Sequence, residues 1–431
     1  MLEGLQYILD KKIVVSTVNA NDLLRAPHEV DSTYDHHAAT FIPLGDVGDY
    51  VHHFRKAVEK SKTPKGMVVA PYGYGKTSTL IFIWHECEEA GLVAVPPFFC
   101  TSLLDILEAI YAWTKYRLEQ RQPDLVKALD EVHYKYAAAT IEEMATRYSE
   151  EHGLAKLTAA NVLNDLLAKG SLVLELTPAN LLFFLDETLN IVLEAGFEGL
   201  AVFPDEFQQY ISKGANLRQV IQQFREFVWG LMTRDSRLGV VFSIPSYTEG
   251  GIQSHGGDIL DRLKEDGLYY NLRDIYTQEF PTRLWARYTD AFELGEAAQQ
   301  VIDEHTLTAI GQIAEREDLG RGPRTVIDAL KCAIVHWQDR GRSYSPVDLI
   351  DDFLYSKIYF EAQANKLKTV TRQALESQAV DTPEKQQAIK LMAAFPRGCP
   401  VSIQKAYGLY DVVNELSKPA HGELMTHLIE G

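Results

Sequence analysis

The sequence lacks any apolar run that approaches the length of about 18 residues needed to span a bilayer. Its four cysteines are widely spaced and form no CxxC pair, which favours neither a zinc site nor a disulfide framework. The first residues lack the basic start and the apolar stretch of a signal peptide. We therefore expect a cytoplasmic protein with no membrane partner.

A basic excess is also lacking, since the formal net charge is −18. Proteins that coat nucleic-acid phosphates are usually basic. The composition therefore argues against broad DNA binding, while contact through a local patch or a partner protein stays open. At 431 residues, the chain exceeds the size at which one hydrophobic core stops growing, so two or three domains are expected.

Short apolar segments alternate with helical patterns in the first part of the chain, which is typical of an α/β protein with a parallel sheet. Apolar residues recur at helical steps between about 103 and 197, which predicts a large helical insertion. The helical pattern returns at 281–376. The segments expected to form strands are 67–70, 92–95 (ended by two prolines), 199–203 and 239–244.

A glycine-rich turn between an expected strand and an expected helix carries the strongest motif. Residues 70–78 read Ala-Pro-Tyr-Gly-Tyr-Gly-Lys-Thr-Ser, the phosphate-loop pattern with alanine in place of the first glycine. Its glycines let backbone N–H groups approach phosphates, and the following helix adds its positive dipole end. We expect Lys76 to contact the β- and γ-phosphates of ATP and the Thr77 hydroxyl to bind Mg²⁺. The loop residues expected to bind the nucleotide are Ala70, Gly73, Tyr74, Gly75, Lys76, Thr77 and Ser78.

Two Asp-Glu pairs follow apolar residues. Only one of them can lie at the end of the strand whose carboxylate binds Mg²⁺. Asp186 and Glu187 lie in a helical frame that begins at Thr177, a hydroxyl cap followed by proline. We therefore interpret this first pair as surface charges of a helix.

Asp205 and Glu206 form the second pair, and they follow the short apolar stretch 199–203. This stretch fits a buried parallel strand. We expect Asp205 to hold Mg²⁺, mostly through water, and Glu206 to polarise the attacking water.

Together, the phosphate loop and the strand ending in Asp-Glu resemble an AAA+ ATPase of the branch that includes origin-recognition and STAND-type proteins. The resemblance implies a P-loop domain at 41–280 and a helical lid at 281–376. It also implies that Ser243 or Ser246, at the end of the next strand, is a polar sensor that positions water.

The resemblance further implies roles for two arginines and for an adenine segment. Arg262 stands where the family has an arginine that reaches the γ-phosphate of a neighbouring subunit. Arg324, with Arg321 as its rival, stands where a lid arginine contacts the γ-phosphate of its own subunit through charge-assisted bonds. Gly45 and Asp46 stand in the segment that touches adenine.

The two ends of the chain are expected to be separate segments. Residues 1–40 form an N-terminal segment, and residues 386–431 a small helical or winged-helix-like domain. One interpretation of the abrupt end is a fragment of a longer protein. The histidine pairs at 36–37 and 52–53 have no defined ligand spacing, so a solvated loop and a helix face explain them better than a metal site.

A narrower resemblance follows from the long insert between Lys76 and Asp205. It is to the ATP-binding proteins of bacterial phage-defence systems such as bacteriophage exclusion (BREX). We expect ATP hydrolysis to drive switching or remodelling of a partner complex, with further copies of the chain or defence proteins as partners. Three alternatives stay open, namely a non-hydrolysing ATP-stabilised scaffold, a STAND-type regulatory DNA-binding protein and a small-molecule kinase.

Overall fold

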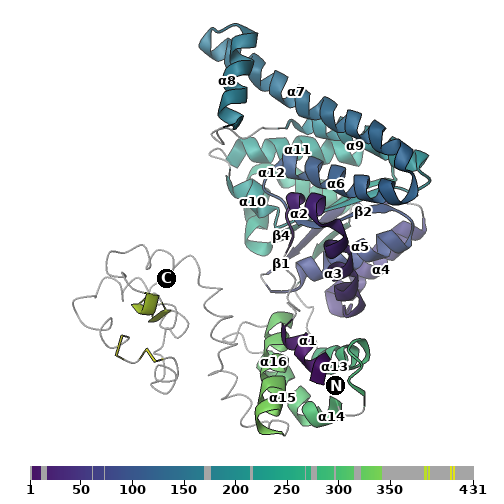
Figure 1. Ribbon diagram of the computed structural model, residues 1–431, viewed down its shortest axis with the longest axis vertical. Coiled ribbons are helices and arrows are strands. Elements are labelled where there is room, and N and C mark those ends of the chain that lie inside the picture. Colours follow the sequence, from purple (N-terminus) through teal and green to yellow (C-terminus); the bar gives the residue numbers. More distant parts are fainter. Residues whose placement is uncertain are drawn as a thin grey trace. The chain divides into compact units, whose positions relative to one another are not determined.

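The structure, a computed structural model, divides the chain into two compact units (Figure 1). We call Lys12–Phe280 the sheet unit, and Met1–Lys11 with Pro281–Gly431 the helical unit. The segment expected at 1–40 is therefore shared between both units. The described residues are 2–10, 17–60, 62–71, 73–168, 176–213, 217–266, 268–272, 279–295, 298–314, 322–341, 383–385, 387–388, 408–409 and 411–412.

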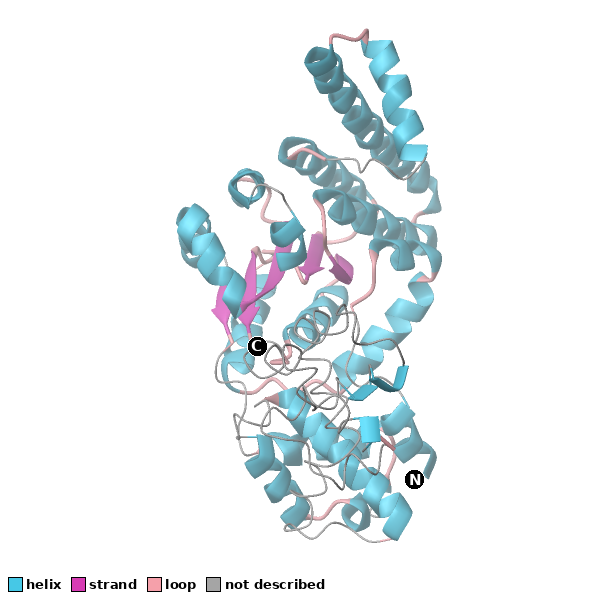
Figure 2. Cartoon of the chain, turned by 90° about the vertical axis from the view of Figure 1, so that its left-hand side faces the viewer, coloured by secondary structure: helices cyan, strands magenta, loops and turns pink. Residues whose placement is uncertain are grey.

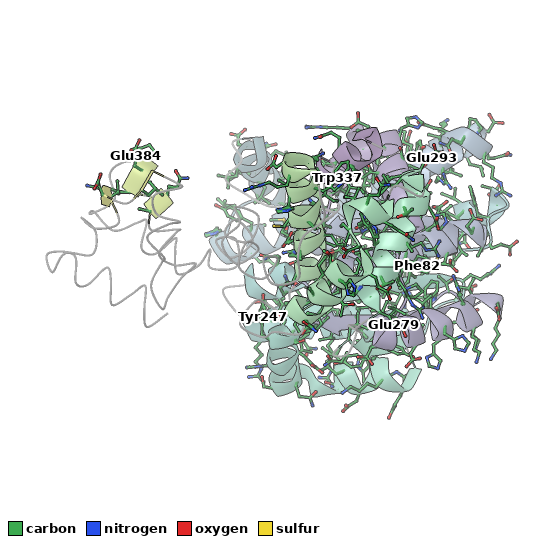
Figure 3. The ribbon with its side chains drawn as sticks, turned by 90° about the horizontal axis from the view of Figure 1, so that it is seen from below. Phe82, Tyr247, Glu279, Glu293, Trp337 and Glu384 are labelled. Carbon is green, nitrogen blue, oxygen red and sulfur yellow. The ribbon has the colours of Figure 1, made fainter. Side chains whose placement is uncertain are left out.

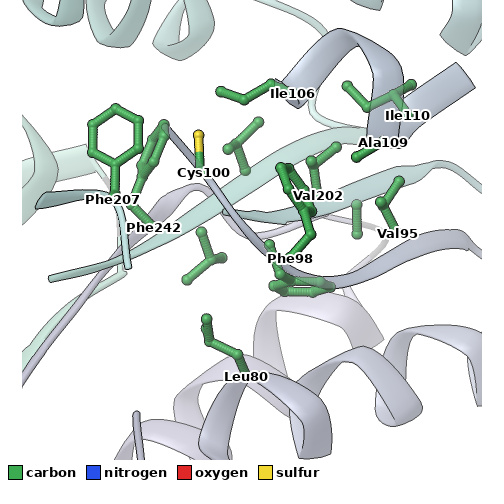
Figure 4. Packing of buried hydrophobic residues seen from close by; sticks show 14 of the residues in the cluster. Leu80, Val95, Phe98, Cys100, Ile106, Ala109, Ile110, Val202, Phe207 and Phe242 are labelled. Carbon is green, nitrogen blue, oxygen red and sulfur yellow. The ribbon is translucent and has the colours of Figure 1, made fainter. Parts of the chain in front are cut away.

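A five-stranded parallel sheet forms the centre of the sheet unit, in the order β2-β3-β4-β1-β5. Figure 4 shows Leu80 on one side of the strands and Ile106 and Ile110 on the other. The predicted α/β class with a parallel sheet is therefore confirmed. The strands are β1 (Gly66–Ala70), β2 (Val93–Phe99), β3 (Leu200–Asp205), β4 (Leu238–Pro245) and β5 (Leu268–Asn271).

Helices cover both faces of this sheet (Figure 2). On one face, α5 (Lys76–Glu89) packs directly on the strands, with α3 (Pro27–Ala39) and α4 (Gly45–Glu59) beside it. On the other face lies a layer of helices, each of which packs against the next one in chain order. They are α6 (Leu103–Arg121), α9 (Pro178–Glu194), α11 (Leu217–Met232) and α12 (Ser246–Asp266), while the short α2 (Ala20–Arg25) packs on α6 and α10 (Gln208–Lys213) on α11.

Strand β2 runs further than the sequence predicts, because it continues through its two prolines to Phe99. Proline cannot donate a ladder hydrogen bond, but β2 is at an edge of the sheet, where such a loss is tolerated. The register to β3 shifts between Val95 and Phe98, where the prolines lie. The extension brings Phe99 into register with Asp205.

The fifth strand was not predicted from the sequence. Strand β5 is short and only half-buried, so it lacks the apolar run that marks the other strands. Its pairing with β1 depends on Gly66, where a Cβ atom would lie 1.9 Å from the Leu268 carbonyl oxygen. Because Gly66 has no side chain, β5 can approach β1 closely enough to pair with it.

The insertion expected near 103–197 is helical, as predicted. Besides α6 and α9, it contains the short η1 (Pro123–Leu125), the long α7 (Val126–His152) and α8 (Lys156–Ala168). Helices α7 and α8 pack together as a hairpin that extends away from the sheet (Figure 1).

The helical unit contains α1 from the N-terminus and the helices expected in the lid. Helix α1 packs on α16, and a Cβ atom at Gly4 would lie 2.5 Å from the Phe292 carbonyl oxygen. The predicted domain at 386–431 lies almost entirely outside the described residues. The helices are α1 (Leu2–Asp10), α13 (Phe280–Ala291), α14 (Ala298–Val301), α15 (Glu304–Ala314) and α16 (Pro323–Arg340).

Candidate functional site

The phosphate-loop motif forms a tight turn between β1 and α5. Gly73 and Gly75 have positive φ angles of 84° and 80°, a conformation that favours glycine. Gly75 caps α5, and a Cβ atom there would meet no heavy atom within 4 Å, so the space beside the loop is open. An open turn at the start of a long helix fits the approach of a phosphate group.

Lys76 is buried, with 5% of its surface exposed. Its Nζ donates to the carbonyl oxygens of Ala70 at 3.2 Å and Pro71 at 3.3 Å. These acceptors are neutral and belong to the loop itself. Charged phosphate oxygens form stronger bonds with an ammonium group and would replace them.

Asp205, the last residue of β3, is fully buried and is the centre of the site. Its Oδ2 accepts from the hydroxyls of Thr77 at 2.6 Å and Thr17 at 2.9 Å. Its Oδ1 accepts from the Ser243 hydroxyl. The phosphate-loop helix, the N-terminal stretch and β4 therefore meet on one carboxylate.

This carboxylate fits a magnesium site. Within the described part of the chain, no cationic side chain forms an ion pair with Asp205. Burying an ionised carboxylate costs several kcal/mol unless hydrogen bonds and an opposite charge offset it. Three hydroxyls supply the hydrogen bonds, and a divalent cation beside Thr77 would supply the charge.

Ser243 and Ser246, the two sensor candidates, lie in different surroundings. Ser243 is buried in β4 and bonds to Asp205, while Ser246 is the first residue of α12. Among the described residues, Ser246 makes no hydrogen bond to this carboxylate. The structure thus brings Ser243 to the site.

Glu206 follows directly and has a φ of 52°. A left-handed backbone is strained for a residue with a Cβ atom, and such strain often accompanies function. The side-chain amide of buried Gln208 donates to Glu206, and the Phe207 amide donates to the Ser243 carbonyl over 3.0 Å. Tyr247 is 77% exposed (Figure 3), and its pKa is raised by partial burial and then by the nearby Glu206 charge.

The expected adenine segment lies beside α5. The Phe41 ring stacks on Phe82 of α5, with 4.6 Å between centroids. Gly45 has a φ of 55° and begins α4, and Asp46 is in its first turn.

Three residues at or near the site were missed from the sequence. Thr17 and Gln208 contact the acidic pair, and no local pattern marks either of them. His37 Nε2 lies 3.1 Å from Ser78 Oγ. The prediction of a solvated loop at 36–37 was wrong, because these residues belong to α3, which packs on α5.

The two candidate arginines lie in different units of the chain. Arg262 lies near the end of α12, with its guanidinium 5.7 Å from the centre of the Trp229 ring. Arg324 is half-buried near the start of α16, in the helical unit. The rival Arg321 is outside the described residues.

The first Asp-Glu pair lies on α9, as predicted. The Thr177 hydroxyl accepts from the Asn180 amide at 3.3 Å and caps this helix. Asp186 pairs with Arg234, and Glu187 pairs with Lys135. These are ordinary surface charges.

No family model and no curated protein matches the chain. Solved structures of the Aeropyrum pernix ORC2 protein are similar to it, in an ADPNP–ADP form and in an ADP form. Each is 15% identical, covers 99% of this chain and 97% of its own, and has a TM-score of 0.40. At this level of similarity, no function is assigned to the chain.

Within the described residues, no helix combines the length and the apolar character that crossing a bilayer requires. These residues also contain no cluster of three or more His, Cys, Asp and Glu side chains placed to hold a metal ion. A magnesium ion at Asp205 would therefore depend on one carboxylate, a hydroxyl, phosphate oxygens and water.

Proposed function

We propose that this chain is an ATPase of the AAA+ type, which binds Mg·ATP at the loop 70–78 and hydrolyses it. The observation that carries the proposal is the 2.6 Å hydrogen bond between Thr77 Oγ1 and Asp205 Oδ2. It joins the first turn after the phosphate loop to the carboxyl end of a buried strand. P-loop enzymes hold nucleotide and metal ion from these two places.

In this proposal, the loop and the first turn of α5 bind the phosphates through backbone N–H groups. Gly73 and Gly75 keep side chains out of the way, and Lys76 moves from its carbonyl acceptors to the β- and γ-phosphate oxygens. Gly45 and Asp46, at the start of α4, would lie toward the adenine. Tyr74 and Ser78 complete the lining of the loop.

Thr77 and Asp205 would hold Mg²⁺, which neutralises phosphate charge when it is bound. The Thr77 hydroxyl would then present its oxygen lone pairs outward. Ser243 holds Oδ1 of Asp205, so the carboxylate keeps its orientation. Glu206 would accept the proton of the attacking water.

The helical unit supplies the expected response to the nucleotide. Arg324 would contact the γ-phosphate, and loss of that phosphate would release it, so the ATP and ADP states would favour different arrangements of the units. Arg262 would act on the nucleotide of another copy, which makes a homo-oligomer the expected active form.

We propose that the chain belongs to the origin-recognition or STAND-like branch and that its ATP hydrolysis remodels a partner complex. The sequence resemblance to phage-defence ATP-binding proteins suggests a defence complex as the setting. The net charge of −18 favours DNA contact through a partner over direct binding.

The test is nucleotide binding and turnover by the parent chain, Lys76→Ala and Glu206→Gln, with and without double-stranded DNA. Glu187→Gln is the matched control, because it makes the same change in the Asp-Glu pair of α9. We expect Lys76→Ala to lose binding. We expect Glu206→Gln to bind ATP but to lose turnover by about a hundredfold or more.

The outcomes separate the alternatives. Tight ATP binding without turnover in the parent would contradict the ATPase and favour the non-hydrolysing scaffold. A phosphorylated acceptor in place of free phosphate would favour a kinase. Stimulation of turnover by DNA would support a role at nucleic acid.

A further inference from the structure

The stretch Thr17–Val18, which we call the edge segment, extends the sheet at its β2 edge. Val18 forms a parallel bridge to Phe98, and the Phe99 amide donates to the Val18 carbonyl over 2.7 Å. The segment therefore pairs with the part of β2 that follows the two prolines, next to the carboxyl end of β3.

Tyr34 of α3 holds the edge segment in place. Its hydroxyl lies 3.4 Å from the Val18 amide, from which it accepts, and donates to the Pro97 carbonyl over 3.0 Å. The ring is buried, with 1% of the residue exposed, and packs edge-on against Trp84. Helix α3 and strand β2 thus fix the backbone beside Thr17 by contacts that do not involve the Thr17 side chain.

The Thr17 hydroxyl takes no part in this pairing, and it donates to Asp205 Oδ2 over 2.9 Å. The same oxygen accepts from Thr77 over 2.6 Å. Two hydroxyls from different segments of the chain thus share one carboxylate oxygen. Their roles differ, because Thr77 belongs to the phosphate loop and Thr17 to a stretch 188 residues from Asp205.

We propose that Thr17 is a positioning residue for the metal carboxylate, an inference that rests on the proposed Mg·ATP site. When the Thr77 oxygen turns toward a cation, its hydrogen no longer serves Oδ2. Thr17 then remains the hydroxyl donor to that oxygen, and Ser243 remains the donor to Oδ1. Asp205 keeps its orientation between these two donors, so part of the magnesium affinity depends on the edge segment.

The variants Thr17→Val and Thr17→Ser isolate this hydroxyl. Valine keeps the shape of threonine and its β propensity but cannot donate, while serine retains the donor. Thr188→Val is the matched control, because Thr188 is a buried threonine on α9 that makes no hydrogen bond to Asp205.

The readout is binding of a fluorescent ATP analogue at increasing Mg²⁺ concentration and, separately, with the metal chelated. Thr17→Val should raise the Mg²⁺ concentration for half-saturation about tenfold, the usual range for loss of a group that orients a metal ligand. Its metal-free nucleotide affinity should match that of the parent. Thr17→Ser and Thr188→Val should behave like the parent.

Three results would overturn the inference. The first is equal Mg²⁺ dependence in Thr17→Val and the parent. The second is a loss of nucleotide affinity in Thr17→Val that is the same with and without metal, which would make the residue merely structural. The third is no Mg²⁺-dependent binding by the parent, and this one alone would remove the proposed function as well.

Discussion

Thr77 and Asp205 are 128 residues apart in the sequence, and a hydrogen bond of 2.6 Å joins them. The carboxylate also accepts from Thr17 and Ser243, so among the described residues its hydrogen-bond donors are all hydroxyls, and it is buried. Such an arrangement keeps a negative charge inside the sheet unit without an ion pair from the described residues. The stability of the unit and its affinity for a cation are therefore expected to oppose each other.

Asp205→Asn tests this opposition. The amide keeps the shape of the carboxylate and removes a buried charge. We expect the thermal unfolding temperature without nucleotide to equal or exceed that of the parent, while the Mg²⁺-dependent part of nucleotide affinity is lost. Thermal unfolding and a nucleotide titration with and without Mg²⁺ measure the two effects.

Asp186→Asn is the control for this change, since Asp186 is the corresponding acid of the α9 pair and is bound to Arg234. It should leave nucleotide binding unchanged. A clear fall in unfolding temperature for Asp205→Asn would show that the carboxylate stabilises the fold, contrary to our expectation.

Glu206→Gly tests whether the backbone at the proposed catalytic position is strained. The left-handed conformation at φ 52° costs a non-glycine residue about 1–2 kcal/mol, and glycine would relieve this cost. The greater freedom of glycine in the unfolded chain destabilises the folded state and cancels about half of that relief. We expect a net gain of about 0.5–1 kcal/mol in unfolding free energy over Glu206→Gln. Both variants should lack turnover.

Glu293 gives the comparison, because it is the other non-glycine residue with positive φ in the described part of the chain, at 51°. It lies in the helical unit, outside the proposed machinery. Glu293→Gly should gain similar stability and keep turnover. Equal unfolding temperatures for Glu206→Gly and Glu206→Gln would remove the argument for strain at that position.

Much of the site could be predicted because its signals are local. The glycines and Lys76 of the phosphate loop stand between an apolar strand and a helix, and the structure has β1 and α5 in those places. The two Asp-Glu pairs were separated by the Thr177 cap and the helical period of α9. Each of these features depends on residues within a few positions of one another.

Contacts between distant segments could not be predicted in this way. Thr17 reaches Asp205 only because the edge segment pairs with β2 beyond the prolines, and that pairing depends on β2 being an edge strand. The prolines themselves favoured a shorter strand. Strand β5 can pair with β1 because Gly66 has no side chain, and this requirement is visible only once the two strands are side by side.

Glu88, near the end of α5, is a largely but not fully buried acid outside the proposed site. It pairs with Arg117 and accepts from the Ala94 amide at 3.1 Å. Burial raises the pKa of Glu88 to about 7 from 4.5, and the Arg117 charge offsets only part of this. The folded state therefore binds the proton more tightly than the unfolded state, and stability is lost as the pH rises through this interval.

We predict that this titration lowers the unfolding free energy by roughly 3 kcal/mol between about pH 4.5 and pH 7.5, at about 1.4 kcal/mol for each unit of pKa difference. Glu88→Gln removes it, so the stability of the parent relative to this variant should fall as the pH rises. Urea unfolding at several pH values measures the difference. A difference that is constant with pH would contradict the prediction.

Arg262 lies near the end of α12, a helix of 21 residues that starts at the carboxyl edge of the sheet and leads to the start of β5. The element is kinked at Gly256, and because β5 runs parallel to β1, the end of α12 lies toward the amino edge of the sheet, away from the phosphate loop that follows β1. In the proposed function, Arg262 acts on the nucleotide of a second copy. Its cation–π contact with Trp229 would orient the guanidinium.

Arg262→Ala should therefore lower turnover by about tenfold or more while leaving nucleotide affinity unchanged, because the lost group acts on the transition state of a neighbour. Arg225→Ala is the control on α11, since Arg225 forms an exposed pair with Asp258. Mixing Arg262→Ala with Lys76→Ala gives the decisive measurement. A Lys76→Ala copy keeps its arginine and an Arg262→Ala copy keeps its phosphate loop, so mixed assemblies should show more turnover than either variant alone. No such increase, in mixtures shown by sedimentation to contain both copies, would place the arginine outside the reaction.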